Sequence, residues 1–264
     1  MKKKIKRPEY QGEVARVPYS FVHSMGHIWA VQKNRVKDYN FEWASGKRCF
    51  ELYEPFSLSP IDMQNYMALL HVLQHPGDFD VIQDVYSEDK YKMTLKMRSL
   101  YEILKLPDAG SSRSDLKKSL QWHCDSRFRV IGDGRVVTYY GMGLHNGRLE
   151  FNGKGRGGGI VVFHIDKSLI NDSGLTHNVS RLINYKTDMA KLIDFLAMGK
   201  LDAGVDLTYN GWIKALTRDS RIDNFKRDFQ PALEEISAGD FIVEVRNDGV
   251  KIKYSGSKQK ALSS

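Results

Sequence analysis

Apolar and polar positions follow a regular order in the last third of the chain, over residues 181–254. Residues 188–198 carry apolar side chains at helical spacing, and residues 205–208 resemble a short strand. Asn210 is a suitable cap for a short helix that runs through Ala215. Residues 222–236 then predict a longer helix, because apolar side chains three and four positions apart make one face: Ile222, Phe225, Phe229, Leu233 and Ile236.

A β-hairpin is predicted after this helix. Residues 241–245 and 250–254 alternate apolar and mixed side chains, and Arg246-Asn247-Asp248-Gly249 separates them. Asn and Gly tolerate the positive φ angles of tight hairpins, so the tip supports this turn. Pro231 is expected to kink or restart the long helix. The order of helix, strand, helix, helix, strand, wing and strand is that of a winged helix, which places one helix in a DNA groove. We expect the helix over residues 222–236 to be basic, and a generic α+β domain whose basic helix face is only solvated is the alternative.

A helix with clear start signals opens an earlier part of the chain. Ser59 is a suitable N-cap, Pro60 suits the first helical position, and Asp62 places a carboxylate near the helix N-terminus. The sequence His75-Pro76-Gly77 ends this helix. Its predicted buried stripe consists of Met63, Tyr66, Met67, Leu70 and Leu73.

The elements after this helix repeat the order of the C-terminal unit. A strand over residues 91–95 and a helix over residues 98–106 precede a basic helix, which is capped by Ser112 or Ser114 and ends near residue 126. Leu116, Leu120 and Cys124 make the core face of the basic helix, and its outer face consists of Arg113, Lys117, Lys118, Gln121 and Asp125. Strands over residues 128–131 and 136–140 then predict a hairpin, and a further pair, residues 148–151 and 160–163, flanks a glycine-rich loop.

The predicted fold class is therefore α+β, with two tandem winged-helix domains. The first 17 residues are expected to be a basic flexible arm, and residues 18–170 an N-terminal winged-helix domain with an N-terminal extension. Residues 171–180 are expected to be a linker, residues 181–256 the C-terminal winged-helix domain, and residues 257–264 a tail. Within the extension, residues 29–32 and 48–53 are strand candidates.

The charge balance favours a polyanionic partner. Lys and Arg outnumber Asp and Glu by 40 to 32, which gives a formal net charge of +8 and a pI near 9.3. No apolar run approaches the length of a membrane span. No apolar stretch follows the basic start MKKKIKR, so a secretory signal is not expected. Cys49 and Cys124 lack metal-ligand spacing, and a reduced cytoplasmic protein is the simplest interpretation.

Signals for catalysis are weak. Residues 153–159 contain a formal G-x-G-x-x-G, but a dinucleotide site needs a helix after it, and here a strand follows. A basic wing loop along phosphate is favoured, and a plain hairpin loop is the alternative. His164-Ile165-Asp166 is not the metal motif of rolling-circle nickases, and Tyr139 and Tyr140 look like strand residues. We therefore expect no enzymatic activity, no cofactor and no bound metal.

The residues 225–236, reading FKRDFQPALEEI, resemble the second recognition helix of the iteron-binding replication initiators of plasmids. That family often carries an aromatic, two basic residues, a Pro-Ala pair and an acidic residue before isoleucine there. Leu58-Ser59 before a long apolar helix, and residues 99–104 before the basic helix, look like its N-terminal domain. In length and spacing the chain is similar to the compact initiator of broad-host-range mobilisable plasmids, over about residues 56–254.

The resemblance implies that each winged helix binds half of a repeated origin element, and that the protein starts replication by melting A·T-rich DNA and recruiting helicase. Duplex DNA with origin repeats is then the partner, with a replicative helicase or host initiator and a second copy of the chain as candidate protein partners. The expected DNA contacts are Arg113, Lys117, Lys118, Gln121, Lys154, Arg156, Arg218, Arg221, Asn224, Lys226, Arg227, Gln230, Arg246 and Lys251.

Three other functions remain open from the sequence. A tandem winged-helix transcriptional repressor would bind a palindrome rather than direct repeats. An origin nickase or primase would need clustered carboxylates or ligand histidines, which the spacing does not supply. An RNA-binding protein would be competed better by single-stranded RNA than by duplex DNA.

Overall fold

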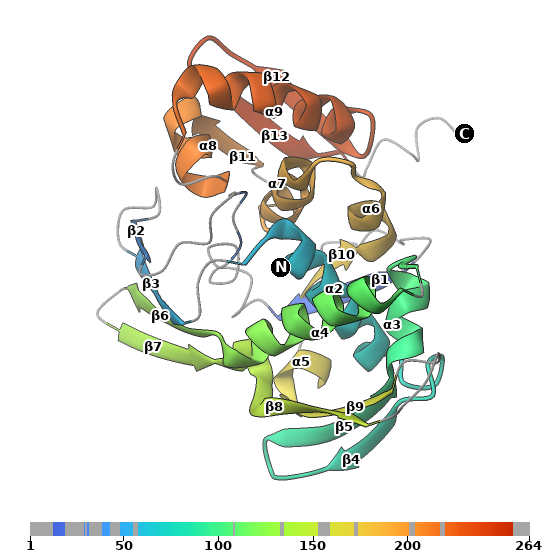
Figure 1. The fold of residues 1–264 in the computed structure, drawn as a ribbon. Helices are drawn as coiled ribbons and strands as arrows, with labels where there is room; N and C mark the ends of the chain where they lie inside the picture. The colour runs from blue at the N-terminus through green and yellow to red at the C-terminus, as the bar shows by residue number, and fades with distance from the viewer. Residues whose placement is uncertain are drawn as a thin grey trace, which may run out of the picture.

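The computed structural model describes residues 13–18, 29, 31, 39–42, 48–54, 58–107, 109–132, 135–152, 159–171, 174–200, 204–216 and 220–255. It combines helices and antiparallel sheets, as the predicted α+β class requires. Figure 1 places the elements from α7 (Asp188–Met198) to β13 (Gly249–Tyr254) at one end of the molecule. The sheet of β4 (Ile82–Val85), β5 (Lys90–Lys96), β8 (Leu144–Asn152) and β9 (Ile160–Asp166) lies at the other end, and α2 (Pro60–Gln74), β1 (Val14–Pro18) and β10 (Gly174–Asn178) lie between them.

The C-terminal part has the predicted order of elements. These are α7 (Asp188–Met198), β11 (Val205–Thr208), α8 (Tyr209–Leu216), α9 (Ile222–Ser237), β12 (Phe241–Val245) and β13 (Gly249–Tyr254). The strands form an antiparallel sheet in the order β11-β13-β12, so the first strand pairs with the last. Four of the five predicted apolar positions of α9 are buried, whereas Ile222 in its first turn is 39% exposed. Trp212 of α8 lies in the core beneath this face.

One local expectation in this part was wrong, and the expected restart of the helix at Pro231 does not occur. Asn210 lies inside α8, and the hydroxyl of Thr208 accepts a hydrogen bond from the Gly211 N–H at 3.2 Å. The cap is therefore Thr208. Pro231 does not end α9, which continues to Ser237. Pro231 lies on the exposed side, while Phe229 and Ala232 beside it are buried, so packing on both sides of the proline keeps the helix continuous.

The N-terminal part uses a similar arrangement. Its elements include α2 (Pro60–Gln74), β4 (Ile82–Val85), β5 (Lys90–Lys96), α3 (Met97–Ile103), α4 (Gly110–Asp125), β8 (Leu144–Asn152) and β9 (Ile160–Asp166). The sheet order is β4-β5-β9-β8, so β5 pairs with β9 as β11 pairs with β13. Ser59 is the N-cap of α2 as predicted, and Asp62 completes a capping box with it.

The hairpin predicted directly after the basic helix is present, but it is not part of the sheet that contains β5. β6 (Arg127–Gly132) and β7 (Arg135–Tyr140) form a separate sheet with β2 (Tyr39–Glu42) and β3 (Arg48–Glu54), in the order β2-β3-β6-β7. The strands after α4 that join the sheet of β5 are instead β9, which pairs with β5, and β8, which pairs with β9. The predicted caps Ser112 and Ser114 lie inside α4, which starts at Gly110 after Ala109, whose methyl side chain cannot cap it.

The ends of the predicted arm and the predicted linker pair with each other. β1 (Val14–Pro18) runs antiparallel to β10 (Gly174–Asn178), and α5 (Ser168–Asn171) and α6 (Val179–Asn184) flank β10. Ala15 and Val17 of β1 are fully buried. The side-chain amide of Gln74 in α2 accepts from the Arg16 N–H at 2.8 Å and donates to the carbonyls of Arg16 and Leu169, both at 2.7 Å. Residues 14–17 and 174–178 are therefore ordered structure rather than arm and linker.

One contiguous core joins the two parts. α2 is buried along almost its whole length and packs against β1, α4, α6 and α7. α7 in turn packs against β10, α9 and β13. Within the described part of the chain, no helix is both long and apolar enough to span a membrane.

Candidate nucleic-acid interface

The outer side of α9 presents most of the C-terminal residues predicted to contact DNA. Phe225 and Phe229 stack at 4.7 Å between ring centroids, and Trp212 lies 5.6 Å from Phe229, which fixes the buried face of the helix. The residues on the opposite side are exposed, and these include Arg221, Asn224, Lys226, Arg227 and Gln230. The sequence therefore identified both faces of this helix.

The charge of α9 differs from the prediction. The helix was expected to be basic, but Lys226 and Arg227 are outnumbered by Asp223, Asp228, Glu234 and Glu235. The Arg227 Nε lies 3.0 Å from the Asp228 carboxylate, and the Gln230 amide donates to Glu234 at 3.0 Å. This face therefore offers acceptors as well as donors. Side chains that donate and side chains that accept suit hydrogen bonding to base edges, because the bases also present both donors and acceptors.

The two predicted wing cations are engaged within the protein. Arg246 forms an ion pair with Asp206 of β11, and Lys251 lies 3.9 Å from Glu244 on the adjacent strand. The Arg246 N–H donates to the Gly249 carbonyl at 2.8 Å and closes the turn. Both ion pairs are partly exposed, so solvent screening keeps them weak and each cation stays able to change partner.

Gly249 is needed in the wing turn for a reason other than the predicted one. The positive-φ residues of the described chain do not include Asn247, Asp248 or Gly249. Instead, a Cβ at position 249 would lie 2.3 Å from the Leu207 carbonyl oxygen and 2.8 Å from the Thr208 Cα. The glycine therefore allows β13 to approach β11 closely.

The outer face of α4 is less exposed than that of α9. Leu116, Leu120 and Cys124 are buried as predicted. Lys118 is exposed, whereas the other predicted contacts are only half-exposed, namely Arg113, Lys117 and Gln121. α4 packs against α2 and β8, which leaves a narrower outer face. Trp122 is half-buried and packs against the core.

Three predicted contacts, Lys154, Arg156 and Arg218, lie outside the described residues. Residues 153–158 of the glycine-rich loop lie outside them too. Among the residues that are described, no group of three or more His, Cys, Asp or Glu could hold a metal ion. Burial, and to a smaller extent Asp125, raises the pKa of the Cys124 thiol to about 12, so this cysteine is a neutral core residue.

Trp29 is an important residue that the sequence did not identify. It is fully buried, and its ring lies 6.2 Å from Tyr66 of α2 and 5.1 Å from Phe195 of α7, edge-on. Its indole N–H donates to the Nε2 of His123 at 3.4 Å, and the His123 Nδ1 donates to the Ser119 carbonyl at 2.7 Å. Trp29 therefore joins α2 and α4 to α7.

The chain near Trp29 also reaches the C-terminal part through its backbone. Trp29 forms a parallel bridge with Leu58 before α2. Two residues later, the Val31 N–H donates to the carbonyl of Leu216, the last residue of α8, at 2.7 Å. Trp29 and Val31 thus act as a strap between the two parts, and the apolar residue types alone gave no signal of these partners.

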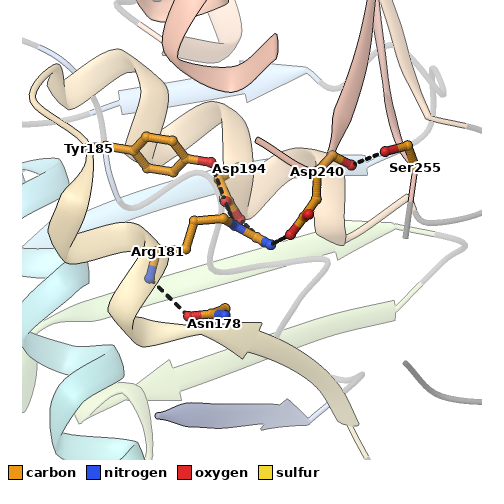
Figure 2. Close-up of polar contacts among 6 residues, drawn as sticks. All are labelled: Asn178, Arg181, Tyr185, Asp194, Asp240 and Ser255. Carbon is orange, nitrogen blue, oxygen red and sulfur yellow. Dashed lines mark hydrogen bonds and ion pairs between the residues drawn. The ribbon is translucent and has the colours of Figure 1, made fainter. Parts of the chain in front are cut away.

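A buried ion cluster fixes α7 to its neighbours (Figure 2). Arg181 of α6 binds Asp194 of α7 through two nitrogens, at 2.5 and 3.0 Å, and Asp240 before β12 at 2.8 Å. The Tyr185 hydroxyl donates to Asp194 at 2.9 Å. Burial raises the pKa of the Asp194 carboxyl, and the Arg181 guanidinium opposes that shift. The buried Arg181 guanidinium and Asp194 carboxylate are each held by several partners, and this cluster therefore positions α6, α7 and the start of β12.

His177 of β10 lies near this cluster. It is fully buried and stacks on Phe195 at 4.6 Å between ring centroids. Within the described part of the chain, neither ring nitrogen has a hydrogen-bond partner. Burial first, and the Arg181 charge second, lower the pKa of His177 to about 3, so the ring is neutral at physiological pH.

Comparison with known proteins identifies a shared fold. Neither a protein-family model nor a curated protein sequence matches the chain. A crystal structure of selenomethionine derivatives of domains 2 and 3 of RctB matches with a TM-score of 0.59 and 10% identity, over 91% of this chain and 99% of that chain. The chain has the fold of these two domains. A second crystal structure of RctB domains 2–3 matches with a TM-score of 0.54 and 11% identity over the same shares.

Proposed function

We propose that the protein is a sequence-specific duplex-DNA-binding initiator of plasmid replication, which binds repeated origin elements through two winged-helix units. The observation that carries the proposal is the equivalence of the two parts. Each has a long helix, α4 or α9, that follows a shorter helix. In each, the strand before the shorter helix, β5 or β11, pairs with the last strand of the unit, β9 or β13. The fold shared with domains 2 and 3 of RctB supports the same interpretation.

In this proposal the outer side of α9 enters the major groove. Asn224, Arg227 and Gln230 then meet base edges, where amide and guanidinium groups pair with adenine and guanine. α4 occupies the equivalent position in the N-terminal unit, and the wing turn lies along the phosphate backbone. The protein acts without a catalytic step of its own, and a replicative helicase or host initiator carries out unwinding.

The proposal is tested by titrating the full chain on the DNA that surrounds its gene. We expect tight binding to a segment with direct repeats beside an A·T-rich stretch, and much weaker binding to a scrambled duplex of equal composition. Affinity should fall by orders of magnitude between about 50 and 200 mM salt, because several phosphate contacts release counterions.

Other outcomes would replace the proposal. Preferred binding to a single palindrome would indicate a repressor, and preferred competition by single-stranded RNA would indicate an RNA-binding protein. Metal-dependent strand cleavage that is lost when Tyr139 or Tyr140 is changed to Phe would indicate a nickase.

A further inference from the structure

Two neighbouring cations on α9 lie in different surroundings. Successive helix residues point about 100° apart. Arg227 is on the outermost side of the helix beside Asp228, whereas Lys226 lies toward α8. The Lys226 ammonium lies 4.3 Å from the centroid of the Tyr209 ring, which is within cation–π distance. The two residues are therefore placed to contact different parts of a ligand.

Tyr209 is held firmly by the wing turn. It is the first residue of α8, and its N–H donates to the Asp248 carbonyl at 2.9 Å. Thr208, the residue before it, pairs with Gly249, where an added Cβ would lie 2.8 Å from the Thr208 Cα. The ring is thereby connected through the backbone to the wing turn and through its face to α9.

We propose that Tyr209 is a positioning residue that holds the Lys226 ammonium for a phosphate of duplex DNA, next to the wing turn, while Arg227 contacts bases. This inference rests on the duplex-DNA binding proposed above. A ring face attracts an ammonium without neutralising its charge, so its N–H groups stay available to a phosphate. Lysine is a flexible point charge, and holding it before binding reduces the conformational entropy lost on contact.

The assignment is tested by a double-mutant cycle with the full chain on origin duplex DNA. Tyr209→Leu should weaken binding about two- to fivefold, which corresponds to a cation–π contact at an exposed site, and Tyr209→Phe should retain near-parental affinity. In a Lys226→Met background the same Tyr209→Leu change should have less than about a 1.5-fold effect, because the coupled partner is gone. An equal loss in both backgrounds would overturn the inference.

A second arm separates phosphate contacts from base contacts. Lys226→Met should weaken binding to the intact site and to every single-base variant by the same factor, and should reduce the slope of log affinity against log salt by about one. Arg227→Ala should instead remove discrimination at one base pair. If Lys226→Met relaxes specificity and leaves the salt slope unchanged, the lysine is a base contact and the inference is wrong.

A third arm needs no DNA and no variant at Tyr209. Lysines of the free protein are labelled with ¹³C-methyl groups, and the Lys226 signal is identified by its loss in Lys226→Arg. Ring-current shielding should displace this signal upfield from that of Lys200, which is exposed at the end of α7. An undisplaced signal overturns the positioning role and leaves the proposed function standing. Failure of the parent to bind any duplex overturns the proposed function, and with it the phosphate assignment.

Discussion

At the residue scale, Gly249 shows how close packing can impose a glycine without positive φ. A Cβ there would lie 2.3 Å from the Leu207 carbonyl oxygen, so Gly249→Ala must push β11 and β13 apart. We expect a loss of about 1–3 kcal/mol in the free energy of unfolding, as for overpacked sites. Gly239→Ala is the matched control, because its nearest atom would be 3.5 Å away, and it should change stability by less than about 0.5 kcal/mol. Equal urea midpoints for the two variants would contradict this account.

Asp194 is the second residue that decides stability. Asp194→Ala leaves the buried Arg181 guanidinium without its bidentate partner, and we expect it to cost about 3–5 kcal/mol of unfolding free energy. Glu102→Ala removes an ion pair of similar length, 2.8 Å to Arg98, but both partners are exposed. That control should cost less than about 1 kcal/mol. Chemical denaturation of both variants measures the difference, and similar losses would show that Asp194 is not held as described.

At the element scale, α9 is the helix that should carry specificity. Arg227→Ala is expected to reduce specific DNA binding by about 1–3 kcal/mol, the usual cost of a lost base contact. Lys200→Ala removes an exposed charge from the end of α7, where β11 begins, at the opposite end of the sheet from the wing turn. It should reduce binding only slightly. The measurement is a titration on specific duplex DNA, and equal losses would exclude α9 as the specificity helix.

Periodicity predicted the helices and strands well, and it failed where pairing depends on distant segments. The bounds of α7 and β11 agree with the prediction, because each has a local apolar pattern and local end signals. The sheet assignment of β6 and β7 was wrong, since their partner β3 lies far upstream and no local pattern reveals it. β1 and β10 were missed because each is short and partly polar, and only their pairing orders them.

The candidate site was predicted unevenly for similar reasons. The exposed face of α9 followed from helical spacing, so Asn224, Arg227 and Gln230 were located correctly on it. The ion pair of Arg246 with Asp206 and the position of Lys226 over Tyr209 were not foreseen. Both contacts join residues that are far apart in sequence. The number and order of charged residues along the chain cannot identify such partners.

At the scale of the whole molecule, the strap formed by Trp29 and Val31 joins the two parts. Trp29→Ala would leave a large cavity between α2, α4 and α7, and we expect a loss of about 3–5 kcal/mol. Hydrogen exchange should therefore accelerate in both α4 and α7, which belong to different parts. Trp122→Ala, at a half-buried position on α4, should affect only its own surroundings. Faster exchange limited to one part in Trp29→Ala would show that the strap does not couple them.

The central claim is that two equivalent units of one rigid chain bind duplex DNA together. Footprinting of the full chain on the DNA around its gene tests this claim most directly. The account predicts two protected patches on one face of the duplex, separated by about one helical turn of 10 base pairs, as expected when two helices enter successive major grooves. A single short patch, or no protection on any repeated element, would contradict it.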